Sequence, residues 1–237
     1  PLEERVRAYM AAARRADEEK GEKTLYTVNI TDEVARLKDN AYRAIEAGAN
    51  ALMVNVFAIG FSGLRLLAED PNVNVPIMAH SCFGGAGTVS PYQGMSTEVA
   101  QKLVRLAGAD ILLNVAPSAK FNALKEKFLR VYQVTRSPMY HIKPALNLVG
   151  GGVTPGMVPY LMELLGNDFV IGAGAAIHGH PLGPRAGATA FRQAISAVLA
   201  GADIKEAASN RPELAAALKE WGIYGVDDYN KLYDIEA

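Results

Sequence analysis

Polar residues follow the short apolar runs of this sequence, and one of them is a histidine. His80 comes directly after the run 75–79, and an imidazole there can exchange protons near neutral pH or hydrogen-bond a substrate. Each asparagine in an equivalent place is also typical of an ordinary strand-end turn. Their joint placement favours a site built from the ends of several strands. The asparagines concerned are Asn29, Asn55 and Asn114.

Two glycine-rich segments follow the last two apolar runs, at residues 150–152 and 172–174. Glycine leaves backbone N–H groups open to an anion, and parallel barrels often bind phosphate after their last two strands. Tight turns use the same residue, so each segment alone is weak evidence. Their paired position predicts a site for a sugar phosphate or a similar enolisable phosphorylated substrate.

Three other residues have side chains that could bind a ligand or react. Lys120 lies five residues after Val115, where a long cationic side chain can reach a bound anion, although most loop lysines are simply solvated. Cys82 has no evident cationic partner in the sequence, which favours a small buried apolar role. His180 precedes Pro181 in the loop that follows the last predicted strand, and we expect it to stabilise that loop.

The elements that position these residues alternate between short apolar runs and longer helical stretches, which indicates a parallel α/β fold. Glycines and capping residues predict helices that start near Thr31 or Asp32, at Ser96 and at Thr154. The predicted strands cover residues 25–30, 51–56, 75–79, 111–115, 145–149 and 169–171.

A helix near the start has no strand before it, and its apolar stripe must pack on something. Because a closed barrel has eight strands, the pattern predicts a (β/α)8 TIM-type barrel without its first two strands, over residues 1–201. Residues 202–237 would then form a carboxyl-terminal helical extension. A six-stranded open sheet is the alternative. The stripe consists of Leu2, Val6, Tyr9, Met10 and Ala13.

Composition narrows the choice of partners and location. The 237 residues are 50% hydrophobic and 21% charged, with a net charge of −1, which gives no electrostatic reason to bind nucleic acid. The apolar runs are too short to span a membrane, and no signal segment opens the chain. The single cysteine excludes an internal disulfide framework. We therefore expect a cytoplasmic protein.

Several motifs resemble those of the RuBisCO large-chain superfamily. The early motifs are similar to those of the RuBisCO-like proteins (form IV), and most closely to the 2,3-diketo-5-methylthiopentyl-1-phosphate enolases of methionine salvage. The resemblance covers residues 1 to about 221. The superfamily motifs are residues 151–159, 174–181, 185–188 and 212–218, and the enolase-like ones are residues 55–60 and 76–80.

The resemblance implies roles for particular positions. His80 matches the family's strand-five active-site histidine, and Lys120 falls at the mobile-loop lysine of the carboxylases. Ser81 stands where carboxylases place a phosphate-binding arginine, and Leu113 where they place a histidine. Losing the bidentate arginine argues against bisphosphate carboxylation. The family's phosphate turns correspond to Gly151, Gly152, Gly174 and Ala175, the last in place of a usual glycine.

The family's metal site, a Lys-x-Asp-Glu segment that binds Mg²⁺ through a carbamylated lysine, has no counterpart in this sequence, so no metal ligand is assigned. The resemblance implies Mg²⁺ and a homodimer for a full-length parent. Its activity would be Mg²⁺-assisted enolisation or isomerisation of a phosphorylated keto sugar, with His80, Asn55 and Lys120 in the catalytic site. A decarboxylase and a carboxylase are alternatives.

An alternative from another functional class is a fragment that serves in binding or assembly and has no catalytic activity. Under either interpretation we expect the chain as given to lack activity, because the metal-site segment is absent, and we expect its first helix to leave an apolar surface that promotes association.

Overall fold

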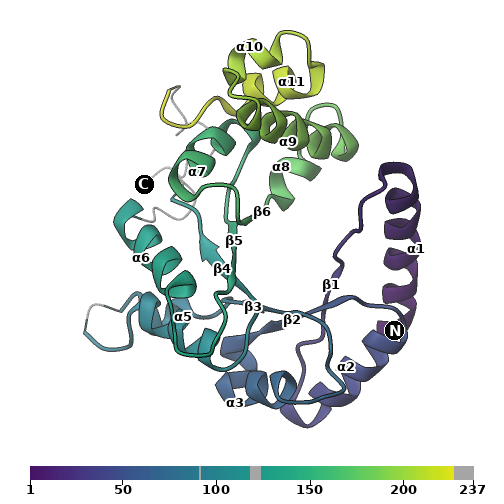
Figure 1. Ribbon diagram of the computed structural model, residues 1–237, viewed down its shortest axis with the longest axis vertical. Coiled ribbons are helices and arrows are strands. Elements are labelled where there is room, and N and C mark those ends of the chain that lie inside the picture. Colours follow the sequence, from purple (N-terminus) through teal and green to yellow (C-terminus); the bar gives the residue numbers. More distant parts are fainter. Residues whose placement is uncertain (91, 118–123, 227–237) are drawn as a thin grey trace. The chain divides into compact units, whose positions relative to one another are not determined.

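Six strands form one sheet in the order β1-β2-β3-β4-β5-β6 in the computed structural model, which describes residues 1–90, 92–117 and 124–226 (Figure 1). The neighbours β1–β2, β2–β3, β3–β4 and β5–β6 pair in parallel. The strands are β1 (Thr27–Asn29), β2 (Ala51–Asn55), β3 (Ile77–His80), β4 (Ile111–Val115), β5 (Leu146–Gly150) and β6 (Val170–Gly172).

Helices connect successive strands, which is the βα repeat that the sequence predicts. The first part has α1 (Leu2–Lys20), the 3-10 turn η1 (Val34–Arg36), α2 (Leu37–Glu46), α3 (Val56–Ala68), α4 (Gly85–Thr88), α5 (Thr97–Leu106) and α6 (Lys125–Arg136). The remainder has η2 (Pro155–Met157), α7 (Val158–Leu165), α8 (Gly174–His178), α9 (Pro184–Leu199), α10 (Ile204–Ala208) and α11 (Pro212–Trp221). An α/β fold of consecutive parallel strands is thereby confirmed.

All six predicted strands are present, with ends that differ by up to two residues. The third strand starts at Ile77 because Pro76 has no N–H to donate to the ladder, although its carbonyl accepts from Leu52. The first starts at Thr27, since the amide of Tyr26 is bound by the side chain of Asn50 instead. The helix expected from Thr31 begins later, as the turn η1.

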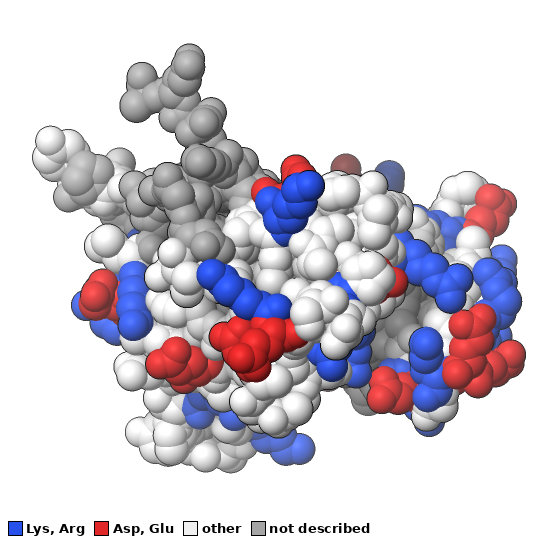
Figure 2. All heavy atoms as spheres, turned by 90° about the horizontal axis from the view of Figure 1, so that it is seen from above, with Lys and Arg blue, Asp and Glu red and all other residues white. Residues whose placement is uncertain are grey.

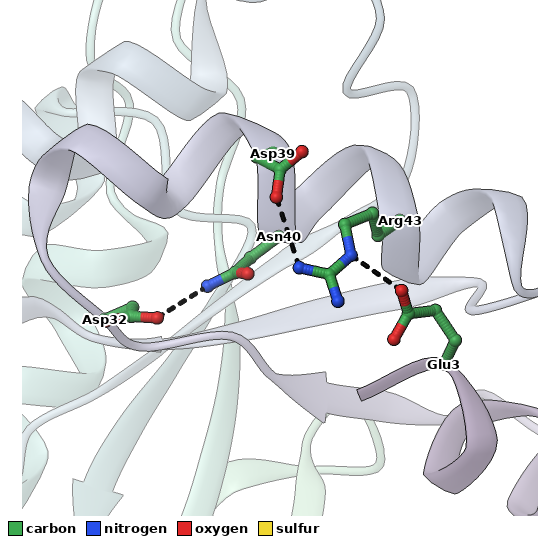
Figure 3. Close-up of polar contacts among 5 residues, drawn as sticks. All are labelled: Glu3, Asp32, Asp39, Asn40 and Arg43. Carbon is green, nitrogen blue, oxygen red and sulfur yellow. Dashed lines mark hydrogen bonds and ion pairs between the residues drawn. The ribbon is translucent and has the colours of Figure 1, made fainter. Parts of the chain in front are cut away.

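The first helix packs against α2 and does not leave its stripe exposed. Val6, Met10 and Ala13 are buried, whereas Tyr9 is 59% exposed and stacks on Tyr26, so its place in the buried stripe was wrong. Arg43 of α2 adds an ion pair to Glu3 at 2.6 Å (Figure 3). The expectation that this helix leaves its apolar stripe exposed is therefore wrong for Val6, Met10 and Ala13, and association of the chain stays a prediction.

The described chain divides into two compact units. The first unit contains Pro1–Leu113 and Arg130–Asn147, and the second contains Asn114–Leu129 and the described residues from Leu148 onward. In the first unit the core is formed by β1 to β3 with α1 to α3 and part of α5. In the second, α9 contacts α7, α8, α10 and α11. The predicted boundary between residues 201 and 202 stays a prediction.

An apolar pocket of about 510 Å³ lies in the second unit, along β6 and between α7 and α9. Only Asn167 and Arg192 add polar side chains to its lining. Its apolar wall includes Met162, Phe169, Ile171, Ile177, Phe191 and Ile195.

Charged side chains of both signs are interspersed on the face seen in Figure 2, with no broad area of one sign. Among the described residues, no helix is both long enough and apolar enough to cross a bilayer.

Candidate functional site

The ends of β1, β2 and β3 lie side by side in the first unit. Asn55 and His80 are register partners at the last positions of β2 and β3, and Asn29 ends β1 beside Met53. Partners in a parallel pair project to the same face of the sheet. Asn55 and His80 therefore lie together, as the predicted site at the strand ends requires.

Thr31 links the first two strand ends. Its hydroxyl donates to Oδ1 of Asn29 at 2.6 Å, and its backbone N–H donates to the same oxygen at 3.0 Å. The threonine oxygen in turn accepts from the backbone N–H of Asn55 at 2.8 Å. An asparagine followed two residues later by a donor is a common local turn. This turn therefore attaches the loop after β1 to the end of β2.

The Asn55 side chain carries the connection to β3. Its amide nitrogen faces two backbone carbonyls and donates to Cys82 at 2.8 Å and to His80 at 3.2 Å. Carbonyl oxygens only accept, so they determine which end of the amide is nitrogen. The Asn55 amide thus holds the turn after β3. Its predicted contact with a substrate stays a prediction.

The His80 ring is held by its own turn. The backbone N–H of Cys82 donates to Nδ1 of His80 at 3.0 Å. A backbone amide can only donate, so Nδ1 carries no proton and the proton of the neutral ring sits on Nε2. Burial also lowers the pKa of His80 below its usual value, which favours the neutral form. No described residue bonds to Nε2.

Ser81 is held from the side by helix α5. The Gln101 side-chain nitrogen donates to the Leu113 carbonyl at 2.8 Å and to Ser81 Oγ at 3.0 Å. Gln101 is 3% exposed, and its amide oxygen is buried without a partner in the described chain. The carbonyl of Leu113 fixes the amide orientation, so Ser81 Oγ accepts and keeps its own proton to donate.

The two predicted glycine turns are neighbours in the second unit. Gly150 and Gly172 are register partners at the ends of β5 and β6. Gly151 and Gly152 follow with φ of 94° and 97°, a region where side chains other than glycine are strained. Glycine is required there by the backbone alone.

Gly174 and Ala175 begin the short helix α8 and are both exposed. A Cβ added at Gly174 would meet nothing within 4 Å, in contrast to Gly172, where it would approach Leu148 to 2.8 Å. Phosphate binding at Gly151, Gly152, Gly174 and Ala175 stays a prediction.

Other predicted residues divide between core and surface. Asn114 is buried and donates to the carbonyl of Phe128, so it ties β4 to α6. Cys82 is exposed, which corrects its expected burial, because its turn faces outward from the end of β3. His180 is buried and stabilises its loop as expected. Lys120 lies outside the described residues.

A Mg²⁺ site was tested against the acidic residues that are present. Within residues 1–90, 92–117 and 124–226, no three His, Cys, Asp or Glu side chains are grouped as a metal-ligand set. Asp32 accepts from the backbone N–H of Glu33 and from Asn40, which lowers its pKa and makes it a helix-start residue (Figure 3). The described residues therefore do not fit the metal that the resemblance implies.

Two residues of the site escaped sequence reasoning. Thr31 had a local signal, because it follows Asn29 at the spacing of an asparagine turn. Gln101 had none, since it lies 20 residues from Ser81 on a different element.

Parallel strands in chain order, alternating with helices and ending in polar side chains and glycine turns, define a domain of the (β/α)8-barrel class with six strands. The family model for the ribulose bisphosphate carboxylase large chain, catalytic domain, matches residues 1–221. The chain therefore belongs to the RuBisCO large-chain family.

Curated relatives include RuBisCO-like proteins. The chain is 52% identical over 222 residues to the ribulose bisphosphate carboxylase-like protein of Archaeoglobus fulgidus, covering 92% of this chain and 51% of the relative. It is 40% identical over 228 residues to the 2,3-diketo-5-methylthiopentyl-1-phosphate enolase of Geobacillus kaustophilus, covering 96% and 55%. The chain thus spans about half the length of these relatives.

Solved structures match over the same region. A RuBisCO-like protein from Alicyclobacillus acidocaldarius superposes with a TM-score of 0.87 at 42% identity, covering 94% of this chain and 56% of that one. The octameric ribulose-1,5-bisphosphate carboxylase/oxygenase from Pyrococcus horikoshii gives 0.89 at 34% identity, covering 94% and 54%. Both comparisons agree with a barrel domain that is incomplete in this chain.

Proposed function

We propose that a protein containing this domain enolises a phosphorylated diketone of the methionine-salvage type. The end of β3 is the observation that carries this proposal. There His80 is held with Nε2 unbonded among the described residues, beside Ser81 and next to Asn55 in register. Enolisation develops negative charge on a carbonyl oxygen, and donors aimed at that oxygen lower the barrier. Identity of 40% to an enolase over 96% of the chain supports the same reaction.

A test compares two substrates on one preparation. The gene product that carries this chain, at its full encoded length, should consume 2,3-diketo-5-methylthiopentyl-1-phosphate, with the enol product followed by absorbance. Ribulose 1,5-bisphosphate with radiolabelled bicarbonate should give no fixed product. Carboxylation without enolisation of the diketone would reject the proposal. Repeating the assay with a chelator decides whether Mg²⁺, expected from the resemblance, takes part.

Carboxylation is the second candidate, and the likeness to the Pyrococcus carboxylase favours it. The residue that argues against it is Ser81, because a hydroxyl cannot replace the two-pronged recognition of phosphate that arginine provides. Decarboxylation would depend on Lys120, which lies outside the described residues. A homodimer and a cytoplasmic location stay predictions.

Phosphate binding by the second unit has its own experiment. Gly174→Leu places a side chain in open space at the start of α8, so the fold should tolerate it while a bound phosphate is displaced. We expect inorganic phosphate, followed by ³¹P NMR, to bind about tenfold more weakly, a loss of roughly 1.4 kcal/mol.

The matched control is Gly85→Leu, because Gly85 also starts a short helix and its Cβ would also meet nothing. Equal weakening by both substitutions would argue against a phosphate site at Gly174.

A further inference from the structure

The end of β3 presents two side chains whose hydrogen-bonding roles are already decided within the first unit. His80 has Nδ1 occupied by the N–H of Cys82, at 3.0 Å. Ser81 has an Oγ lone pair occupied by the amide of Gln101, also at 3.0 Å. Each group therefore has a proton left to donate, on Nε2 and on Oγ respectively.

The same contacts make His80 a poor base. To accept a proton at Nε2, the neutral ring must carry its proton on Nδ1, which would face the N–H of Cys82 and break that bond. The turn is also held by Asn55, whose amide binds the carbonyls of His80 and Cys82. Moving the ring proton to Nδ1 would thus break one of the three hydrogen bonds that define this turn.

Gln101 determines the role of Ser81. The Leu113 carbonyl fixes the amide nitrogen toward β4, and the remaining proton of that nitrogen points to Ser81 Oγ. The buried amide oxygen of Gln101 has no partner in the described chain, and an unpaired buried acceptor destabilises the fold. The residue is therefore better placed to orient Ser81 than to stabilise the fold.

We propose that the end of β3 supplies two neutral hydrogen-bond donors to oxygen atoms of the substrate, Nε2–H of His80 and Oγ–H of Ser81, with Gln101 as a positioning residue. His80 then stabilises the developing enolate oxygen, and the base that removes the carbon-bound proton is a different group. The catalytic part of this inference rests on the proposed enolase function. The protonation state of the ring does not.

The ring itself is tested first, on the 237-residue chain without substrate. Long-range ¹H–¹⁵N NMR at about pH 7.5, one unit above the ordinary pKa of histidine, should show His80 protonated at Nε2 only. Assignment uses the loss of its signals in His80→Asn. A ring protonated at Nδ1, or at both nitrogens, overturns the proposal whether or not the protein is an enolase.

Two substitutions then separate a donor from a base in the full gene product. Glutamine can place an N–H near the position of Nε2 but cannot act as a base, whereas asparagine can only replace the Nδ1 acceptor. We expect His80→Gln to lose roughly tenfold in kcat/KM and His80→Asn roughly 10²–10³-fold, as for removal of one oxyanion donor. Equal losses of about 10²–10⁴-fold would identify a base instead.

Gln101→Met tests the positioning role. Methionine keeps the volume and removes an unpaired buried oxygen, so the thermal midpoint should change little, while kcat falls roughly tenfold because the Ser81 proton is no longer directed. Ser81→Ala should give a similar loss, and the double variant should lose no more than Ser81→Ala alone. Additive losses, or a loss of folding without a change in kcat, would reject the coupling.

Discussion

Two histidines in this molecule occupy turns of the same local design but face different surroundings. Both rings accept at Nδ1 from the backbone N–H two residues later, Cys82 for His80 and Leu182 for His180, each at 3.0 Å. Both rings therefore carry the proton of their neutral form on Nε2. The turn itself does not distinguish a structural histidine from a functional one.

The difference lies at the second nitrogen. His180 is 4% exposed, its Nε2 lies 3.0 Å from the carbonyl of Glu213, and its ring meets Trp221 edge to face. His80 is only partly buried, and no described residue bonds its Nε2. In the second unit the fold uses the Nε2 donor of His180, whereas in the first unit no described residue bonds the Nε2 donor of His80.

The largest effect expected from this comparison is on stability. His180→Ala removes two hydrogen bonds and the ring that packs edge to face on Trp221, so it should lower the free energy of unfolding by about 2–4 kcal/mol. His80→Ala should cost under about 1 kcal/mol, because the Cys82 amide is exposed to water.

Urea unfolding followed by fluorescence measures the first substitution, since Trp221 is the only tryptophan and touches His180. Circular dichroism measures the second. Equal losses of unfolding free energy in His180→Ala and His80→Ala would show that Nε2 of His80 also makes a stabilising contact within the fold.

Asparagine substitutions isolate the second nitrogen. Asparagine can still accept from the backbone N–H two residues later but does not reach as far as Nε2. His180→Asn should therefore cost about 1–3 kcal/mol through loss of the bond to the Glu213 carbonyl and of the ring contact with Trp221, and His80→Asn close to nothing. Both are measured as midpoint shifts in urea at constant slope. A clear loss of stability in His80→Asn would contradict the difference proposed between the two histidines.

The smallest effect is a pH dependence at His80. Burial lowers the pKa of the folded ring, so the unfolded chain binds the proton more readily. The contribution to stability is thus fully present above the ordinary histidine pKa of about 6.5 and is lost as pH falls through the lower folded value. The unfolding free energy of the wild type minus that of His80→Asn should be close to zero above neutral pH and should become negative on acidification, because only the wild type carries the ring. A positive value at low pH would mean that the folded ring gains a proton more easily than the unfolded one.

The sequence alone determined the order of the elements and the location of the candidate site at the strand ends. Apolar runs of three to six residues, interrupted by capping residues and glycines, placed all six strands, because buried parallel strands and helix ends depend on local composition. The position of His80 at a strand end followed from the same pattern. The two-residue errors arose where Pro76 has no N–H for the ladder and where the side chain of Asn50 binds the N–H of Tyr26.

Only the tertiary structure decided which atoms of the site are available. The free nitrogen of His80, the orientation of Asn55 and the link from Gln101 to Ser81 depend on contacts between different strands and helices. The packing of α1 on α2, which covers Val6 and Met10, is another such contact. Hydrogen bonds depend on distance and direction within tenths of an ångström, and residue order along a chain does not encode that geometry locally.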